Sequence, residues 1–289
     1  MTNSAINPTV TGKNSDGSYA PVNGLNLYYE TYGRPSPTGA PPLILLHGGL
    51  GVIGMFSQVL SPLAEARQVI GVELQAHGHT ADIDRPLSFE AMADDIAALI
   101  KYLGYENADV LGYSLGGGVA LQTAIRHPDA VRRLVVVSGT FKRVGWYPDT
   151  LAGMSAVSGD LARGWVGSPM QIAYASVAPK PEDWPMLADK VGNLLRQDYD
   201  WSKSVAEMKM PTLIVIGDAD GVMPAHAVEM YELLGGGTVS ILPDGSMTPH
   251  SGAQLAILPN TTHFSILDRA NLLLPIVTQF LDAPVQEAK

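Results

Sequence analysis

The sequence predicts an α/β fold, a mostly parallel, twisted sheet with helices on both faces and an inserted helical cap. Short apolar runs alternate along the chain with segments of helical periodicity. Strands and helices that alternate in this way form parallel sheets, and ligands bind beyond the carboxyl ends of such strands. The alternation stops between residues 141 and 205. We therefore expect an insertion there, and functional residues directly after strands.

Six continuous apolar runs are predicted to be buried parallel strands, because each is too short for a helix. They are Leu43–Leu46, Val69–Val72, Asp109–Leu111, Leu134–Val137, Thr212–Ile216 and Gln254–Leu258. Residues 22–32 combine the turn-forming pair Asn23-Gly24 with β-forming residues, which predicts a hairpin at one edge of the sheet. Helices are predicted at Ser88–Leu103, where Ser88 can cap the start, and at Leu115–Arg126.

The composition is that of a soluble globular protein. A chain of 289 residues with 46% hydrophobic content can bury a sizeable core. Asp and Glu outnumber Lys and Arg 28 to 18, which argues against nucleic acid or an anionic membrane as a partner. The chain has no cysteine, so disulfides, thiolate metal sites and a cysteine nucleophile are excluded.

The N-terminal residues 1–18 are interpreted as a flexible leader. They are rich in Asn, Thr, Ser and Gly and lack the basic start and apolar run of a signal peptide. No apolar stretch reaches membrane-spanning length, and we predict a cytoplasmic protein. The core domain is expected to comprise residues 19–140 and 206–289, with residues 141–205 as the helical cap.

A candidate nucleophile lies in Gly112-Tyr113-Ser114-Leu115-Gly116, directly after a predicted strand and before a predicted helix. A nucleophilic serine needs a sharp, strained turn, and flanking glycines relieve the crowding there. The helix beginning at Leu115 would direct backbone N–H groups toward a reacting carbonyl. The motif alone arises by chance in roughly one chain of this length in ten, and a glycine-rich turn without catalysis is the alternative.

A second glycine-rich loop, His47-Gly48-Gly49-Leu50-Gly51, follows the first predicted parallel strand. Such a loop can approach a substrate closely and present an unpaired backbone N–H. The N–H groups of Gly49 and Leu115 would then form a two-donor oxyanion hole. We expect His47 to organise this loop rather than to transfer protons. The alternative is an ordinary glycine-rich turn.

With these motifs the chain resembles the α/β-hydrolase family, in particular serine carboxylesterases and lactonases with a helical cap. Gly217-Asp218-Ala219-Asp220 follows a late predicted strand and resembles the family's G-x-x-D turn, which implies that Asp220 is the acid of a catalytic triad. Leu258-Pro259-Asn260-Thr261-Thr262-His263-Phe264 resembles the loop that holds the family's histidine. The resemblance implies a triad of Ser114, His263 and Asp220, in the family's chain order. Asp218, in the same turn, is the rival acid.

The resemblance implies acyl transfer to water. His263 would deprotonate Ser114, an acyl-enzyme would form, and Asp220 would orient the imidazole. Carboxylic esters are the expected substrates, with lactones as a further class. Carbon–carbon bond hydrolysis of vinylogous diketones and cofactor-free perhydrolysis are alternatives on the same triad. Serine at position 114 argues against dehalogenase and epoxide hydrolase activity, because related enzymes with those activities use an aspartate there.

The predicted cap contains all four tryptophans of the chain. The candidate substrate-binding residues are Trp146, Trp165 and Trp184. Together with Met170 and Met186 they predict an apolar acyl or aryl pocket over the triad. The alternative is that these side chains pack only the small core of the cap.

No metal or cofactor is expected, because the sequence lacks H-E-x-x-H, a clustered carboxylate set and G-x-x-x-x-G-K-S/T. The expected partner is a small-molecule ester or lactone, and a non-catalytic small-molecule receptor is the alternative outside enzymes.

The chain departs from the family after the second parallel strand. Many members carry an acid, any residue, Arg and Gly there, whereas this chain has Glu73-Leu74-Gln75-Ala76-His77-Gly78. Residues 243–251 are predicted to form a surface loop, and a position near the rim of the active site is the alternative.

Overall fold

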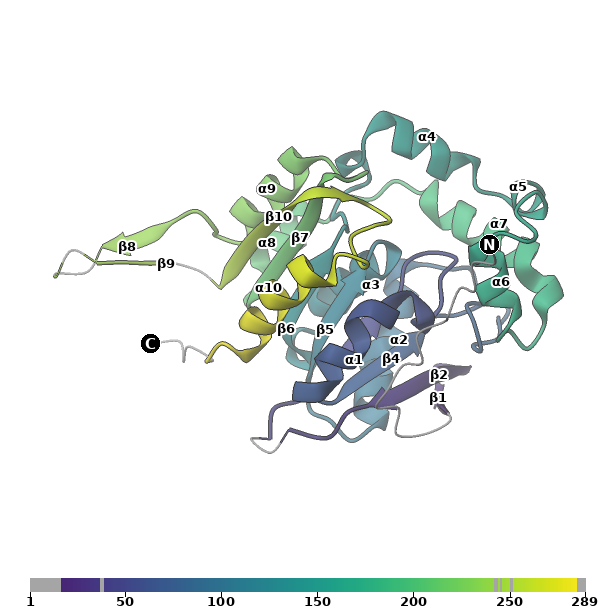
Figure 1. Ribbon diagram of the computed structural model, residues 1–289, viewed down its shortest axis with the longest axis horizontal. Helices are drawn as coiled ribbons and strands as arrows, with labels where there is room; N and C mark the ends of the chain where they lie inside the picture. Colours follow the sequence, from purple (N-terminus) through teal and green to yellow (C-terminus); the bar gives the residue numbers. More distant parts are fainter. Residues whose placement is uncertain (1–16, 37–38, 242–243, 245, 250–251, 285–289) are drawn as a thin grey trace, which may run out of the picture.

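An eight-stranded sheet forms the centre of the protein, with the strand order β1-β2-β4-β3-β5-β6-β7-β10 (Figure 1). The strands are β1 Ser18–Val22, β2 Leu25–Tyr32, β3 Leu43–Leu46, β4 Val69–Glu73, β5 Ala108–Tyr113, β6 Val131–Val137, β7 Thr212–Ala219 and β10 Ala253–Thr262. Strand β2 runs antiparallel to β1 and β4, and all other neighbours are parallel. The predicted mostly parallel α/β sheet is confirmed.

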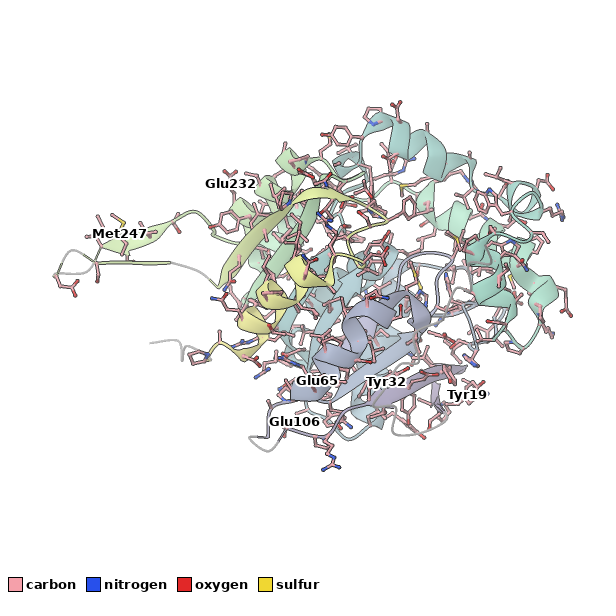
Figure 2. The ribbon with its side chains drawn as sticks, in the orientation of Figure 1. Tyr19, Tyr32, Glu65, Glu106, Glu232 and Met247 are labelled. Carbon is pink, nitrogen blue, oxygen red and sulfur yellow. The ribbon has the colours of Figure 1, made fainter. Side chains whose placement is uncertain are left out.

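The computed structural model describes residues 17–36, 39–241, 244, 246–249 and 252–284. The predicted leader therefore lies outside the described residues up to residue 16, and so does part of the predicted surface loop 243–251. Residues 247–249 of that loop form strand β9, Met247–Pro249, which pairs with β8, Val239–Ile241. Figures 1 and 2 show this two-stranded ribbon, with Met247 on it, projecting from the body of the protein.

Each predicted strand lies inside an observed one. Burial on both faces requires continuous apolar sequence, and the runs in β3 to β7 are buried. The prediction of burial is wrong for β10 at the sheet edge, where only Leu258 of the run Gln254–Leu258 is buried. In β3 all four residues are buried, and alternate side chains enter two different cores. The predicted hairpin forms at the sheet edge as β1 and β2. Its turn residues Asn23 and Gly24 have φ of 49° and 81°, and two consecutive positive φ values suit a tight hairpin turn.

Helices cover both faces of the sheet. They are α1 Ser57–Ala66, α2 Phe89–Tyr102, α3 Leu115–Arg126, α9 Pro224–Leu233 and α10 Ala270–Asp282, with short 3₁₀ helices η1 Ile53–Phe56 and η2 Pro128–Ala130. The buried residues of α1 and α10 share one core, and those of α2, α3 and α9 share the other. The predicted helices α2 and α3 are confirmed, and the Ser88 hydroxyl caps α2 by accepting from the Ala91 N–H.

The chain between β6 and β7 is helical and contributes no strand to the eight-stranded sheet. It forms η3 Arg143–Gly145, α4 Pro148–Ala156, α5 Gly159–Arg163, α6 Pro169–Ala175, η4 Pro181–Asp183, α7 Trp184–Leu195 and α8 Ser202–Glu207. Helices α4, α5 and α6 pack on α7, whereas α8 packs on α3 and α9 of the core. Figure 1 shows α4 to α7 gathered at one end of the molecule. We call residues 141–205 the helical insertion.

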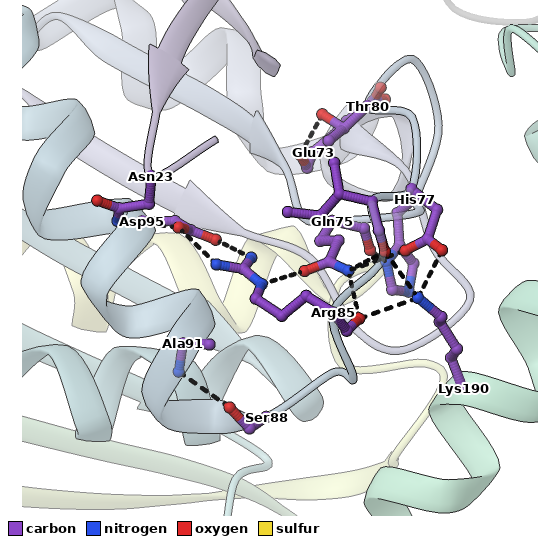
Figure 3. Close-up of polar contacts among 12 residues, drawn as sticks. Asn23, Glu73, Gln75, His77, Thr80, Arg85, Ser88, Ala91, Asp95 and Lys190 are labelled. Carbon is purple, nitrogen blue, oxygen red and sulfur yellow. Dashed lines mark hydrogen bonds and ion pairs between the residues drawn. The ribbon is translucent and has the colours of Figure 1, made fainter. Parts of the chain in front are cut away.

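A polar network joins the helical insertion to the core (Figure 3). Lys190 on α7 donates to the Asp82 carboxylate and to the backbone carbonyls of Ile83 and Arg85. The Arg85 guanidinium pairs in turn with the buried Asp95 of α2. Because the ammonium group satisfies three acceptors of one loop, it fixes α7 relative to the sheet.

Gln75 stands where many members of the family that the sequence resembles carry arginine, and it belongs to the same network. Its side-chain amide donates to Asp82 and to the Arg85 carbonyl, and its oxygen accepts from Arg85 Nε. Arg85, ten positions later in the chain, therefore supplies the guanidinium beside this strand end.

Two buried histidines tie the loop after β3 to the loop after β4. His47 Nδ1 bonds the Gly48 carbonyl, and its Nε2 accepts from the Leu74 N–H at 3.1 Å. His77, in the loop after β4, makes the reciprocal hydrogen bond to the loop after β3: its Nε2 accepts from the Leu50 N–H at 3.1 Å. Both rings must be neutral to accept at Nε2. His47 thus organises the glycine-rich loop, as expected from the sequence.

Of the helices that the structure describes, none is long and apolar enough to cross a membrane.

Replacing Lys190 with methionine should loosen the helical insertion. A hydrogen bond to a charged group contributes about 1.5–3 kcal/mol, so we expect the free energy of unfolding to fall by about 2 kcal/mol. Amide hydrogen exchange in α7 should accelerate. Lys180→Met is the matched control, because Lys180 lies in the same insertion and is exposed. Equal effects of the two substitutions would contradict the anchoring role.

Acidification should destabilise the fold through His47 and His77. Burial lowers the pKa of His47 to about 3 and the pKa of His77 to about 4, whereas an unfolded histidine titrates near about 6.5. Between these values the unfolded chain binds more protons than the folded chain. The free energy of unfolding should therefore fall as pH falls, by about 1.4 kcal/mol per pH unit for each histidine.

Denaturant titrations between about pH 6.5 and about pH 5 measure this slope. The variant His77→Gln keeps an acceptor for the Leu50 N–H but does not titrate. This variant should reduce the slope by the contribution of one histidine, about 1.4 kcal/mol per pH unit. An unchanged slope would show that His77 is not a titrating group.

Candidate active site

Ser114 lies in a strained turn between β5 and α3. Its backbone has φ of 55° and ψ of −119°, a conformation that costs free energy in a residue other than glycine. The flanking glycines permit this turn. A Cβ on Gly112 would lie 2.0 Å from the carbonyl oxygen of Gly116, and one on Gly116 would lie 2.3 Å from that of Leu46. The turn presents the serine hydroxyl beyond the carboxyl end of β5.

Three side chains from three strand ends form one hydrogen-bonded chain. Ser114 Oγ lies 3.0 Å from His263 Nε2, and His263 Nδ1 lies 2.8 Å from Asp220 Oδ1. Asp220 follows β7 and His263 follows β10, which are parallel neighbours. The structure therefore brings together all three residues of the predicted triad.

Asp220 is buried and has hydrogen-bond donors besides the imidazole. Oδ2 accepts from the Ser138 hydroxyl, and Oδ1 accepts from the Val222 N–H at 3.1 Å. Burial alone would raise the pKa of Asp220, but the hydrogen bonds from His263, Ser138 and Val222 outweigh it and hold the pKa below its ordinary value. The carboxylate can therefore stay ionised and orient the His263 ring.

Asp218, the rival acid, points elsewhere. Its two carboxylate oxygens accept from the backbone N–H groups of Asn260 and Thr261, both at 2.9 Å. These hydrogen bonds lower the pKa of Asp218, which is exposed. Asp218 therefore ties the end of β7 to the segment before His263, while Asp220 contacts the ring itself.

The predicted oxyanion donors lie next to each other beside Ser114. A Cβ on Gly49 would lie 3.3 Å from the Leu115 side chain, and all three residues line one cavity. In the glycine-rich loop, the N–H of Leu50 donates to His77 and the N–H of Gly51 to the Gly48 carbonyl. The N–H groups of Gly49 and Leu115 donate to no residue that the structure describes, so both are available to a ligand.

The cavity above Ser114 has a volume of about 970 Å³ and a mostly apolar wall. Its large apolar side chains are Leu50, Phe89, Leu115, Trp146, Met154, Val157, Trp165, Met170, Val191, Leu195 and Phe264. Trp146 packs edge-on against the His263 ring with 5.3 Å between centroids. The predicted residues Trp146, Trp165 and Met170 therefore lie in the wall.

The position of Trp184 corrects the prediction that it binds substrate. Its indole is fully buried, packs at 5.4 Å from the Tyr174 ring and donates from Nε1 to the Ala162 carbonyl. Neither Trp184 nor Met186 lines the cavity. Trp184 fills the core between α5, α6 and α7, while Val191 of the same helix faces the cavity. Trp184 and Val191 are seven positions apart and lie on the same buried face of α7, so the apolar pattern alone does not show which turn of the helix reaches the cavity.

Several wall and positioning residues had no predicted role in the site. Tyr113 donates its hydroxyl to the backbone carbonyl of His263 at 2.8 Å, which ties the nucleophile turn to the histidine loop. Thr140 and Tyr199 join their hydroxyls at 2.7 Å in the cavity wall. Thr140 and Tyr113 each follow a predicted strand, and Tyr113 is a variable position of the G-x-S-x-G motif, whereas Tyr199 had no signal in the sequence. Among the described residues, no group of three or more His, Cys, Asp or Glu side chains could hold a metal ion.

Two relatives of this chain have names that describe hydrolases. An AB hydrolase superfamily protein of Bacillus subtilis is 29% identical over 222 residues, covering 69% of this chain and 80% of that protein. A pimeloyl-(acyl-carrier protein) methyl ester esterase of Neisseria meningitidis is 38% identical over 190 residues, covering 66% of this chain and 60% of the esterase.

Comparison with solved structures and with a family model identifies the fold. The enol-lactonase of Burkholderia xenovorans LB400 matches with a TM-score of 0.69 and 21% identity, covering 92% of this chain and all of that one. Residues 41–167 match the model of the alpha/beta hydrolase fold. With the sheet described above, these matches show that the chain has the α/β-hydrolase fold.

Proposed function

We propose that the protein is a serine hydrolase that cleaves carboxylic esters, with lactones as a second substrate class. The observation that carries this proposal is the continuous hydrogen-bonded chain from Ser114 Oγ through His263 to the buried Asp220 carboxylate. A serine hydroxyl is inert at its ordinary pKa and becomes a nucleophile when a neutral imidazole accepts its proton. The names of a methyl ester esterase and an enol-lactonase among the relatives and fold neighbours support this substrate class.

In the proposed reaction, Ser114 Oγ attacks the ester carbonyl carbon while His263 Nε2 takes the hydroxyl proton. The tetrahedral oxyanion accepts hydrogen bonds from the Gly49 and Leu115 N–H groups, and each such donor contributes about 3–4 kcal/mol to the transition state. His263 then returns the proton to the departing alcohol, which leaves an acyl-enzyme. Water, deprotonated by His263, attacks the acyl carbon and releases the acid with Ser114 restored.

We assign the helical insertion, residues 141–205, the role of a cap over a core of residues 19–140 and 206–289. Helices α4, α6 and α7 contribute Met154, Met170 and Val191 to the same cavity that Ser114 lines. A wall of this kind excludes water from the reacting carbonyl and gives the substrate an apolar surface.

Hydrolysis of p-nitrophenyl esters, with acyl chains from two to twelve carbons, tests the proposal. The parent should turn over the esters and should gain one fluorophosphonate group by intact mass, and Ser114→Ala should do neither. We expect the rate to fall by about 10⁴-fold or more in the variant, with both proteins folded by circular dichroism. A folded parent with neither turnover nor labelling would contradict the proposal and favour a binding protein.

The two aspartates of the β7 turn provide a matched pair of variants. Asp220→Asn removes the carboxylate that orients His263, and kcat should fall by about 10⁴-fold. Asp218→Asn should keep kcat within about tenfold, because this exposed side chain contacts only backbone N–H groups before the histidine. The assignment of the acid fails when the larger loss occurs at Asp218.

A further inference from the structure

Of the residues that the structure describes, no lysine or arginine lines the active-site cavity. Among the described residues that line it, the side chains that ionise are Asp220, His263 and Tyr199. Asp220 already binds His263, Ser138 and Val222. The fixed charge nearest to a bound substrate is therefore negative, and no lysine or arginine of the wall can pair with a substrate anion.

Five cations near the wall in sequence have partners outside it, and two of them, Lys142 and Arg163, pair with Glu229 and Asp160. Arg143 Nε donates to the Leu195 carbonyl at the end of α7, and Arg196 donates to the Val157 carbonyl just after α4. Leu195 and Val157, which provide these carbonyls, line the cavity, whereas the two arginines do not line it. Lys190, next to the lining residue Val191, is held by the loop after β4. Arg143, Arg196 and Lys190 hold the cavity wall in place and leave its inner surface without positive charge.

The wall hydroxyls are also largely paired. Thr140 bonds Tyr199 at 2.7 Å, Ser168 Oγ accepts from the Gln171 N–H, and the Thr262 hydroxyl bonds Ser265. A substrate carboxylate in this cavity would lose its water without gaining a charged partner, which is unfavourable.

We infer that the site selects electrically neutral esters with apolar acyl and alcohol groups and rejects esters that carry a second, free carboxylate. This inference rests on the proposed function and specifies its substrate class. A cavity of about 970 Å³ can accommodate a substrate with a long acyl chain or an aromatic group.

Three esters of one chain length test the inference. They are p-nitrophenyl octanoate, mono-p-nitrophenyl suberate, in which a carboxylate replaces the terminal methyl group, and the methyl ester of that suberate. We expect kcat/KM for the suberate half-ester to be about 100-fold below that for the octanoate, with the methyl-capped suberate within about tenfold of the octanoate. Rates within about threefold of each other for all three esters would overturn the inference.

A gain-of-function variant tests the cause of the selectivity. Met170 lines the cavity and is 37% exposed, so Met170→Lys places an ammonium group in the wall with access to solvent. Val166→Lys is the matched control, because Val166 is 69% exposed and does not line the cavity. Met170→Lys should raise kcat/KM for the suberate half-ester about tenfold relative to the octanoate, and Val166→Lys should not.

Equal gains in the two lysine variants would overturn the inference, because they would trace the selectivity to net charge rather than to the cavity wall. Equal hydrolysis of all three esters by a parent that fluorophosphonate labels would overturn the inference alone. Failure to hydrolyse any ester, with no labelling of Ser114, would overturn the proposed function and the inference with it.

Discussion

The left-handed backbone at Ser114 is the constraint on which the rest of the site depends. The chain must leave β5, reverse and enter α3 within a few residues, and only a close approach of backbone to backbone allows this. Gly112 and Gly116 provide that approach, because a Cβ on either would collide with a carbonyl oxygen. The strain at φ of 55° is held in place by β5, whose six residues are all buried.

The loops around this turn are held by hydrogen bonds of the buried His47, His77 and Tyr113 and of the exposed Asp218. His47 and His77 each accept one backbone N–H of the opposite loop, and burial keeps both rings neutral. Asp218 holds the segment before His263, and Tyr113 holds the carbonyl of His263 itself. The 3.0 Å contact between Ser114 and His263 therefore depends on hydrogen bonds made outside the triad.

Three positively charged side chains of the helical insertion bind groups outside the cavity and do not line it. Arg143 and Arg196 bind carbonyls of the cavity wall from outside, and Lys190 binds the loop of the core. Cations at helix C-termini stabilise those helices by interacting with their unpaired carbonyls. The same arrangement leaves an apolar inner surface beside a buried carboxylate, which ties the stability of the insertion to the chemistry that the cavity can accept.

The sequence by itself determined the strands, the helices α2 and α3, and the three strand ends that carry Ser114, Asp220 and His263. These features depend on local patterns, since burial requires apolar runs, tight turns require glycine, and parallel strands bring their carboxyl ends to one edge. Only the tertiary structure decided which aspartate of the β7 turn contacts the imidazole. Asp218 and Asp220 differ by two positions, and the difference lies in which strand neighbour each carboxylate reaches.

The tertiary structure also decided the roles of the tryptophans. Trp146 contacts the His263 ring, whereas Trp184 fills the core of the insertion. Tryptophan suits both places, and the apolar pattern of a helix shows which face is buried without showing which neighbour that face contacts. The pairing of Arg85 with Asp95 and of Lys190 with Asp82 joins residues ten and 108 positions apart. Such contacts form only when the chain has folded, because sequence spacing does not encode them.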